Sequence, residues 1–405
     1  MIFFGITGSF ASAVIYDKYQ TRRARQKWCD LVSHIADEPL PKHQMPRKLT
    51  VYLSAPPGDG LRYAREHFHE YVKPVLVAAG VDWDSIEGRK EGDVRYKTAE
   101  NIRKKRRKAG EGEIGEGLEG EMMVEQQRRN NGTRDWDGVA GDIVVGRTAW
   151  KEYIRGVHEG WLGPVDAPKE VESAPGQPAI PNSAVESAAI APSDDNLQQP
   201  LIPDQAQDAS QSEESSPTEP KPEDEKKEAE EKPKPRQPPP YIQPSKFDTA
   251  TLSSHTPELI GPSIGVRMPH ILGFRHTPLR IYRFLNRRYL ADSVGRDVAS
   301  AVLASYRPYS TVPAQESGDE GAASAGTSEV SEATRVLDFE EKDWYKLVRR
   351  DREPHEESVW IEEPKVDERL AGRMRAFQLT AEDEDRAKRI GDGTEKVRRG
   401  ADEEV

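Results

Sequence analysis

The chain has 405 residues, a formal net charge of −12, 32% charged residues and 7% aromatic residues. This acidic balance argues against a general nucleic-acid binder, and the low aromatic content indicates that much of the chain forms no hydrophobic core. The one cysteine, Cys29, excludes an internal disulfide and any zinc site built from several cysteines. We therefore predict no metal and no cofactor.

Residues 1–16 form an uncharged apolar run, and the chain after them is polar. A bilayer-spanning helix needs about 20 apolar residues, so the run is slightly short. Three interpretations are open: a membrane span whose first part precedes this sequence, a secretory signal peptide, or a buried helix of a soluble domain. Ala11-Ser12-Ala13 fits a signal cleavage site, but no basic segment precedes the run. We expect an incomplete transmembrane anchor over residues 1–16.

The anchor and the residues after it offer two candidate contact sites. Gly5, Ser9 and Ala13 lie four residues apart on one helix face, and such a stripe lets another membrane helix approach closely. A basic flank suited to anionic headgroups at the membrane surface follows directly. It consists of Lys18, Arg22, Arg23, Arg25 and Lys27. We predict membrane-helix packing at the first site and contact with the membrane surface at the second.

Residues 17–45 predict a basic amphipathic helix that ends before Pro39, with Trp28, Leu31, Val32 and Ile35 on its apolar face. An α/β domain is expected over residues 46–166. Its strands and helices alternate, in the order 49–53, 64–79, 81–86, 94–108, 142–145 and 148–161. This alternation with short turns predicts parallel strands joined by helices.

Three details of this domain are predicted from single residues. Pro74 is expected to kink the second element, Gly80 to end it, and Thr148 to cap the last helix. A Gly- and Glu-rich loop is expected before residue 142. The basic run 103–108 predicts a solvated helix end, with a phosphate- or cardiolipin-binding patch as the alternative.

The rest of the chain divides by composition. Residues 167–240 and 311–333 are rich in small, polar and charged residues and predict disordered linkers. Residues 241–310 are expected to continue the α/β domain, 334–379 to form a C-terminal helical segment, and 380–405 to form a charged tail. Further predicted elements are a strand at 264–274 and helices at 279–289, 291–304, 340–350 and 365–377. Expected inward residues are Ile281, Phe284, Leu285, Val294, Val298, Val302, Trp344, Leu347 and Val348.

The order of elements resembles the N-terminal α/β domain of diacylglycerol and NAD kinases, where a strand enters a Gly-Gly-Asp-Gly-Thr nucleotide loop. The matching stretch is DIVVGRT at 142–148, where only Gly146 and Thr148 align and Arg147 replaces the acidic residue. Phosphoryl transfer needs a carboxylate to hold its metal. We therefore predict a Rossmann-like α/β fold without catalytic residues. The alternative is a lipid or nucleotide kinase-like enzyme that uses residues 49–161.

Four stretches together resemble the Tim54 family, the large accessory subunit of the mitochondrial inner-membrane carrier translocase. They are ITGSFASAVIYDKYQTRRARQKWCDLVSHIADEPL, RKLTVYLSAPPGDGLRYAREHFHEYVKPVLVAAGVDW, GDIVVGRTAWKEYIRGVHEGWLGP and IGVRMPHILGFRHTPLRIYRFLNRRY. The resemblance implies a non-catalytic, single-pass protein of the mitochondrial inner membrane with its bulk in the intermembrane space. It also implies a role in assembling or stabilising the translocase that inserts multispanning carriers.

The resemblance further implies a set of partners: other translocase subunits, small intermembrane-space chaperone complexes, inner-membrane lipid and, indirectly, carrier precursors. Family members carry extra residues before the span, so we expect residues upstream of this sequence. The charge pattern disagrees with the implied topology. Because the basic flank follows the apolar run, the positive-inside tendency would place the C-terminal bulk in the matrix. The expected topology therefore rests on the resemblance alone.

Overall fold

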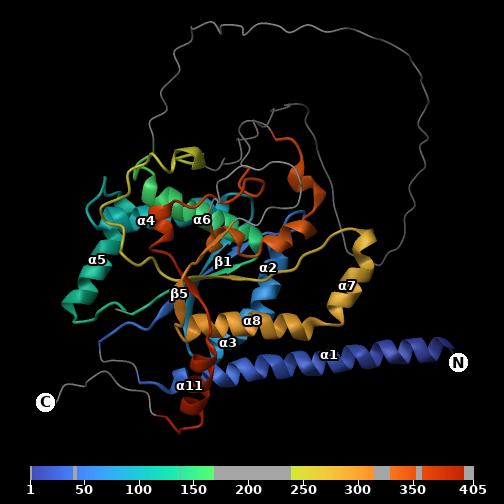
Figure 1. Ribbon diagram of the computed structural model, residues 1–405. Coiled ribbons are helices and arrows are strands. Elements are labelled where there is room, and N and C mark those ends of the chain that lie inside the picture. Colours follow the sequence, from blue (N-terminus) through green and yellow to red (C-terminus); the bar gives the residue numbers. More distant parts are fainter. Residues whose placement is uncertain are drawn as a thin grey trace, which may run out of the picture. The chain divides into compact units, whose positions relative to one another are not determined.

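The computed structural model of the protein describes residues 2–39, 43–136, 138–167, 239–313, 329–352 and 358–395. Nearly all of the predicted linker 167–240, most of the predicted linker 311–333 and the end of the predicted charged tail lie outside these residues. A central sheet with helices on both faces organises the described part (Figure 1).

The central sheet has six strands in the order β2-β1-β3-β4-β8-β5. Their bounds are β1 Lys48–Ser54, β2 Asp82–Gly88, β3 Asp142–Val145, β4 Ser263–Val266, β5 Tyr306–Pro308 and β8 Arg375–Phe377. The first five strands in this order pair in parallel, and β5 pairs antiparallel with β8. The α/β class is confirmed, and the predicted parallel sheet is corrected to a mixed, mostly parallel one.

Alternate strand residues feed one hydrophobic cluster on each face of the sheet, because successive side chains point to opposite sides. Val51 and Val145 belong to the cluster that packs against α1 (Ile2–Val32), α2 (Leu61–His67), α3 (Lys73–Ala78), α8 (Arg287–Val302) and α11 (Ala381–Gly391). Tyr52 and Val144 belong to the cluster that packs against α4 (Asp93–Lys108) and α6 (Arg147–Leu162). The central strands are therefore buried on both faces, as parallel strands covered by helices generally are.

The predicted end of the second element is confirmed, and its α-helix is interrupted near Pro74, where a kink is predicted. A π-helical turn, Phe68–Val72, separates α2 from α3. Pro74 has no N–H and its ring crowds the carbonyl four residues earlier, so regular α-helical spacing is lost just before it. Gly80 then takes a φ of +64°, and the N–H of Val81 returns to the Leu76 carbonyl, which closes the helix with a Schellman motif.

The N-terminal helix α1 is continuous from Ile2 to Val32, so the apolar run and the predicted amphipathic helix form one rod. A 3-10 turn, Ser33–Asp37, ends it. Trp28 and Val32 are buried, which confirms the predicted apolar face. Among the described residues, no helix has both the length and the apolar content that a membrane crossing requires. The expected transmembrane anchor is therefore not confirmed.

The C-terminal segment differs most from the prediction. In place of a helix at 340–350 there are two 3-10 turns, Asp338–Asp343 and Lys346–Arg349, and Leu347 is 58% exposed. In place of a helix at 365–377 there are α10 (Glu368–Ala371) and the strand β8, and α11 lies in the expected charged tail. Helices this short are marginal on their own, so contacts with the sheet decide their conformation.

Several further elements lie in residues for which the sequence predicts loops, and one of two predicted helix faces is not buried. α5 (Glu116–Asn130) occupies the expected Gly- and Glu-rich loop. β6 (Thr311–Pro313) pairs with β7 (Glu329–Ser331), and α9 (Glu332–Arg335) follows. In α8 the predicted face of Val294, Val298 and Val302 is buried, whereas the Ile281 and Phe284 side chains of α7 (Thr277–Phe284) are exposed, contrary to prediction.

The basic run 103–108 is not a solvated helix end. Arg103 is fully buried and donates to Glu159 at 2.6 Å. Arg106 pairs with Glu111 at 2.6 Å and donates to the Gly160 carbonyl. Close packing of α4 on α6 makes this possible, because a Cβ on Gly160 would lie 2.7 Å from that of Ile102. The acidic partners come from other elements, so the sequence prediction is wrong here.

Candidate functional site

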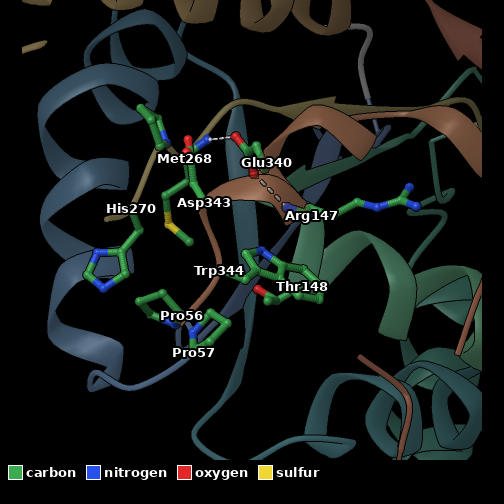
Figure 2. Close-up of a pocket in the computed structure, with 10 residues that line it drawn as sticks. Pro56, Pro57, Arg147, Thr148, Met268, His270, Glu340, Asp343 and Trp344 are labelled. Atoms are coloured by element: carbon green, nitrogen blue, oxygen red, sulfur yellow. Dashed lines mark hydrogen bonds between the residues drawn. The ribbon is translucent and has the colours of Figure 1, made fainter. Parts of the chain in front are cut away.

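Strands β1, β3 and β4 end at one edge of the sheet, where α/β proteins commonly bind ligands. A crevice at this edge is lined by Pro56, Pro57, Arg147, Thr148, Met268, Pro269, His270, Glu340, Asp343 and Trp344 (Figure 2). Gly146, with a φ of +85°, turns the chain from β3 into α6 beside it. The space left is about 20 Å³, which is enough for one water molecule.

Glu340 fills the position in this crevice that an anionic ligand would take. Its carboxylate accepts the backbone N–H of Arg147, the first residue of α6, at 3.0 Å and that of Met268 at 2.7 Å (Figure 2). Burial raises the pKa of Glu340, while these two hydrogen bonds and the charge of Arg267 lower it. Backbone N–H groups at a helix N-terminus are a common phosphate site. Here a carboxylate of the same chain occupies it.

The two aligned positions of the kinase-like stretch take other roles. The guanidinium of Arg147 points away from Glu340 (Figure 2). It donates to Glu341 and to the carbonyls of Thr334 and Val336, and so holds residues 334–341 against the start of α6. Thr148 is 2% exposed, and its hydroxyl has no hydrogen-bond partner among the described residues. Thr148 does not cap α6, because the helix already begins at Arg147 and Gly146 is its N-cap.

A second buried carboxylate, Glu152 of α6, occupies the N-terminus of α4. It is 0% exposed, accepts the Val94 N–H at 2.9 Å and accepts the Trp360 indole N–H at 2.6 Å. Burial raises the pKa of Glu152 to about 7, although hydrogen bonds from Trp360, Gly92 and Val94 lower it. Two helix N-termini near this edge of the sheet are therefore matched by carboxylates of the chain itself.

Replacing Glu152 with glutamine is expected to change how stability depends on pH. Burial raises the folded-state pKa of Glu152 from 4.5 to about 7, so the folded state favours the protonated carboxyl. The resulting contribution to the free energy of unfolding is fully present below pH 4.5 and is lost as the pH rises to about 7. Glutamine does not titrate. The unfolding free energy of the variant, relative to the parent, should therefore rise by about 3 kcal/mol across this window.

Urea unfolding in a mild detergent, at pH values between 4.5 and 8, measures this difference. Glu66, whose side chain is 60% exposed, provides the control variant Glu66→Gln, for which a small, pH-insensitive difference is expected. A Glu152→Gln difference that stays constant between pH 4.5 and 7 would show that the carboxyl does not titrate as proposed.

The predicted membrane-packing stripe lies on an uncovered part of α1. Gly5 and Ser9 are exposed and Ala13 is half-buried. A Cβ on Gly5 would meet no described atom within 4 Å. Large apolar side chains of the same stretch are also uncovered, with Phe3 73% and Phe4 77% exposed. No described segment packs on Gly5, so membrane-helix packing remains a prediction.

The five residues of the predicted basic flank do not share one surface. Arg25 donates to the Glu70 carbonyl at 3.0 Å, and Lys27 lies 3.6 Å from Asp292. These two side chains fasten α1 to the sheet-bearing domain. The other three, Lys18, Arg22 and Arg23, are exposed and keep the surface that the prediction requires.

Sequence reasoning gave no role to Asp17, which joins α1 to α8. Asp17 is 3% exposed and accepts the backbone N–H groups of Arg287 and Arg288 at 3.2 and 3.3 Å, at the start of α8. The Arg288 guanidinium adds an ion pair at 3.2 Å. The signal in the sequence is one acidic residue between an apolar run and a basic flank, which is too little to identify a helix cap.

Comparison with known proteins gives consistent matches over most of the chain. A family model described as "Inner membrane protein import complex subunit Tim54" matches residues 1–377. The chain is 46% identical, over 98% of its length, to the mitochondrial import inner membrane translocase subunit tim54 of Aspergillus oryzae, and covers 87% of that protein. It is 43% identical, over 98% of its length and 80% of the relative, to the Neurospora crassa protein of the same name. For the Schizosaccharomyces pombe protein the identity is 31%, over 85% of this chain and 83% of the relative.

Proposed function

Because this chain belongs to the Tim54 family of mitochondrial inner-membrane import translocase subunits, we propose that it is a non-catalytic, membrane-anchored subunit of the translocase that inserts multispanning carrier proteins. The match over residues 1–377 carries this proposal. In that complex the protein helps to assemble and stabilise the other subunits. It also offers a docking surface in the intermembrane space to the small chaperone complexes that deliver carrier precursors.

The exposed apolar part of α1 supports the membrane anchor. Residues 2–16 form about four turns of uncharged helix, roughly 22 Å long, against a hydrocarbon core of about 30 Å. A helix that leaves Phe3, Phe4 and Ile15 between 69% and 77% exposed gains apolar burial only from lipid or from another protein. Gly5, Ser9 and Ala13 are the face on which a membrane helix of another subunit would pack.

The closed crevice supports a non-catalytic role. A nucleotide phosphate at the start of α6 would have to displace Glu340 from two backbone N–H groups. The Arg147 side chain, which stands where the kinases carry an acidic residue, is bound to Glu341 and cannot hold a metal. These contacts weigh against the kinase-like alternative.

Mitochondria that lack the protein test the proposal. We expect blue-native electrophoresis to show a smaller or less abundant carrier translocase, and import of a multispanning carrier to fall, because an assembly subunit is missing. A matrix-targeted precursor serves as the control, and its import should be unchanged. An intact carrier translocase together with normal carrier import would refute the proposed role.

Topology requires a separate measurement. Epitope tags at both ends of the chain, with protease added to mitoplasts, report which side of the inner membrane each end occupies. The proposal expects loss of the C-terminal tag in mitoplasts but not in intact mitochondria. A C-terminal tag protected in mitoplasts would place the domain in the matrix, as the basic flank alone predicts.

A further inference from the structure

The short helix α7 turns its apolar side chains away from the domain. On a helical wheel Pro278, Ile281 and Tyr282 share one face, and Arg280 and Arg283 lie on the opposite one. No residue of α7 is buried, and Tyr282 is 62% exposed. Phe274, in the 3-10 turn just before it, is 91% exposed. A surface helix of a soluble protein has the reverse arrangement.

The polar face of α7 contacts the domain through Arg283, while Arg280 on the same face stays exposed. Arg283 donates to Asp343 at 2.7 Å. This pair holds α7 against the 3-10 turn Asp338–Asp343, which lines the crevice. The amphipathic pattern is therefore real, but the domain takes the polar side. The apolar side is left for a partner that the described part of the chain does not contain.

The segment around α7 is strongly basic. Residues 274–289 contain five arginines and no acidic residue, in a chain whose net charge is −12. Arg283, Arg287 and Arg288 have acidic neighbours in the domain or on α1. Arg275 and Arg280 are exposed, and neither has an ion pair within the described residues. A partner with negative charge next to apolar surface fits this combination.

Contacts between α1 and α8 fix the position of the end of α7 along the length of α1. Asp17, the first charged residue after the apolar run, caps the start of α8, and α7 ends three residues before that start. In the view of Figure 1, α7 is drawn across the direction of α1. The end of α7 thus lies where the apolar run meets the polar part of the chain.

Exposed tyrosines mark the same level. Tyr16 and Tyr19 of α1, Tyr282 of α7 and Tyr289 of α8 are between 55% and 64% exposed. The Arg288 guanidinium lies over the rings of Tyr16 and Tyr289, at 5.6 and 4.5 Å from their centroids. Tyrosine is enriched at the boundary between bilayer and water, because its ring is apolar and its hydroxyl is polar.

We propose that α7, with Phe274 before it, is an interfacial helix that lies on the surface of a bilayer containing anionic lipid. Its apolar face enters the headgroup region, and Arg275 and Arg280 attract the lipid phosphates. The inference rests on the proposed anchoring of residues 2–16, which brings α7 to the membrane. Anchor and interfacial helix together hold the domain in one orientation on the bilayer.

The test uses the full chain in vesicles, with a fluorescent probe on a cysteine at position 282. Cys29→Ser removes the native thiol, and Tyr282→Cys provides the labelling site. In vesicles of phosphatidylcholine and cardiolipin, we expect the emission to shift to the blue and aqueous iodide to quench it poorly. In pure phosphatidylcholine both effects should weaken. The control Val124→Cys, at an exposed site on α5, should stay quenchable in both.

Charge variants and flotation separate this inference from the anchor. Arg275→Gln with Arg280→Gln should lower the partition of α7 to the anionic surface about 25-fold, since each basic residue near such a surface contributes about fivefold. A chain that floats with vesicles while the probe at position 282 stays quenchable overturns the inference and leaves the anchor standing. A chain that does not float overturns both. Protection that arises only in the intact translocase would assign α7 to a protein partner and overturn the inference.

Discussion

Replacing Glu159 with alanine is expected to lower the free energy of unfolding by about 3–5 kcal/mol, because the change leaves two arginines buried without their shared counter-charge. Glu159 accepts from Arg95 at 2.5 Å and from Arg103 at 2.6 Å, and all three side chains are 0% exposed. The backbone N–H of Tyr241 completes the site at 3.1 Å, and its ring covers the Arg103 guanidinium. Glu159 therefore joins α4, α6 and the segment after the long linker.

Urea unfolding of the detergent-solubilised chain measures this loss. Glu66→Ala is the matched control, because Glu66 pairs with Arg62 on the surface, where such a pair contributes less than about 1 kcal/mol. Glu159→Gln, which keeps the shape and part of the hydrogen bonding, should lie between the two. Replacing all three buried side chains by apolar ones should restore much of the loss. If Glu159→Ala lowers the free energy of unfolding no more than the control does, the buried cluster of Glu159, Arg95 and Arg103 does not stabilise the fold.

The parts of the fold that sequence predicts well are those whose signal is local. Strand β1 combines apolar residues and a Pro-Gly turn within ten positions, and α6 shows a clear apolar stripe, so both appear where expected. Strand β8 carries no such signal. It is three residues long and depends on pairing with β4 and β5, which lie about 110 and 70 positions earlier in the chain. The sequence around it reads as a helix until that pairing is known.

The residues inside the candidate site could not be predicted from the sequence either, because their partners are distant in the chain. Glu340 and Glu152 look like solvated charges in a chain with 71 acidic residues. Only the folded chain brings Glu340 to the start of α6, 193 positions away from Arg147. The basic run 103–108 is the matching case, since its partners Glu159 and Glu111 are set by helix packing.

The apolar face of α7 shows what the spacing of residues does not determine. The spacing of Ile281, Tyr282 and Leu285 shows that these residues share a helix face, but not whether that face meets the protein core or another phase. We expected Ile281 and Phe284 to point inward, and both are exposed. For α8 the same kind of pattern predicted a buried face correctly. The difference lies in the polar contact of Arg283 with Asp343, which sequence alone does not reveal.

Replacing Trp28 with alanine is expected to cost about 3–5 kcal/mol and to loosen α1 from α8, because a fully buried indole leaves a large cavity. Trp28 is 1% exposed and donates to Asp292 at 2.9 Å. Chemical unfolding gives the loss in stability, and proteolysis within residues 17–32 reports the loosening. Trp136, at 36% exposure, supplies the control Trp136→Ala, which should change neither by much. Equal losses in the two variants would contradict a special role for Trp28.

Gly295 allows the contact to be tested from the other side. A Cβ at Gly295 of α8 would overlap the Trp28 ring, so Gly295→Ala alone should cost about 1–3 kcal/mol through overpacking. In the double variant the new methyl group enters space that the indole has left. Its loss should therefore be smaller than the sum of the two single losses, with a coupling of about 0.5–3 kcal/mol. Additive losses would mean that the two residues do not press on each other. In that case α1 would be held mainly by the Asp17 cap and the Arg25 contact.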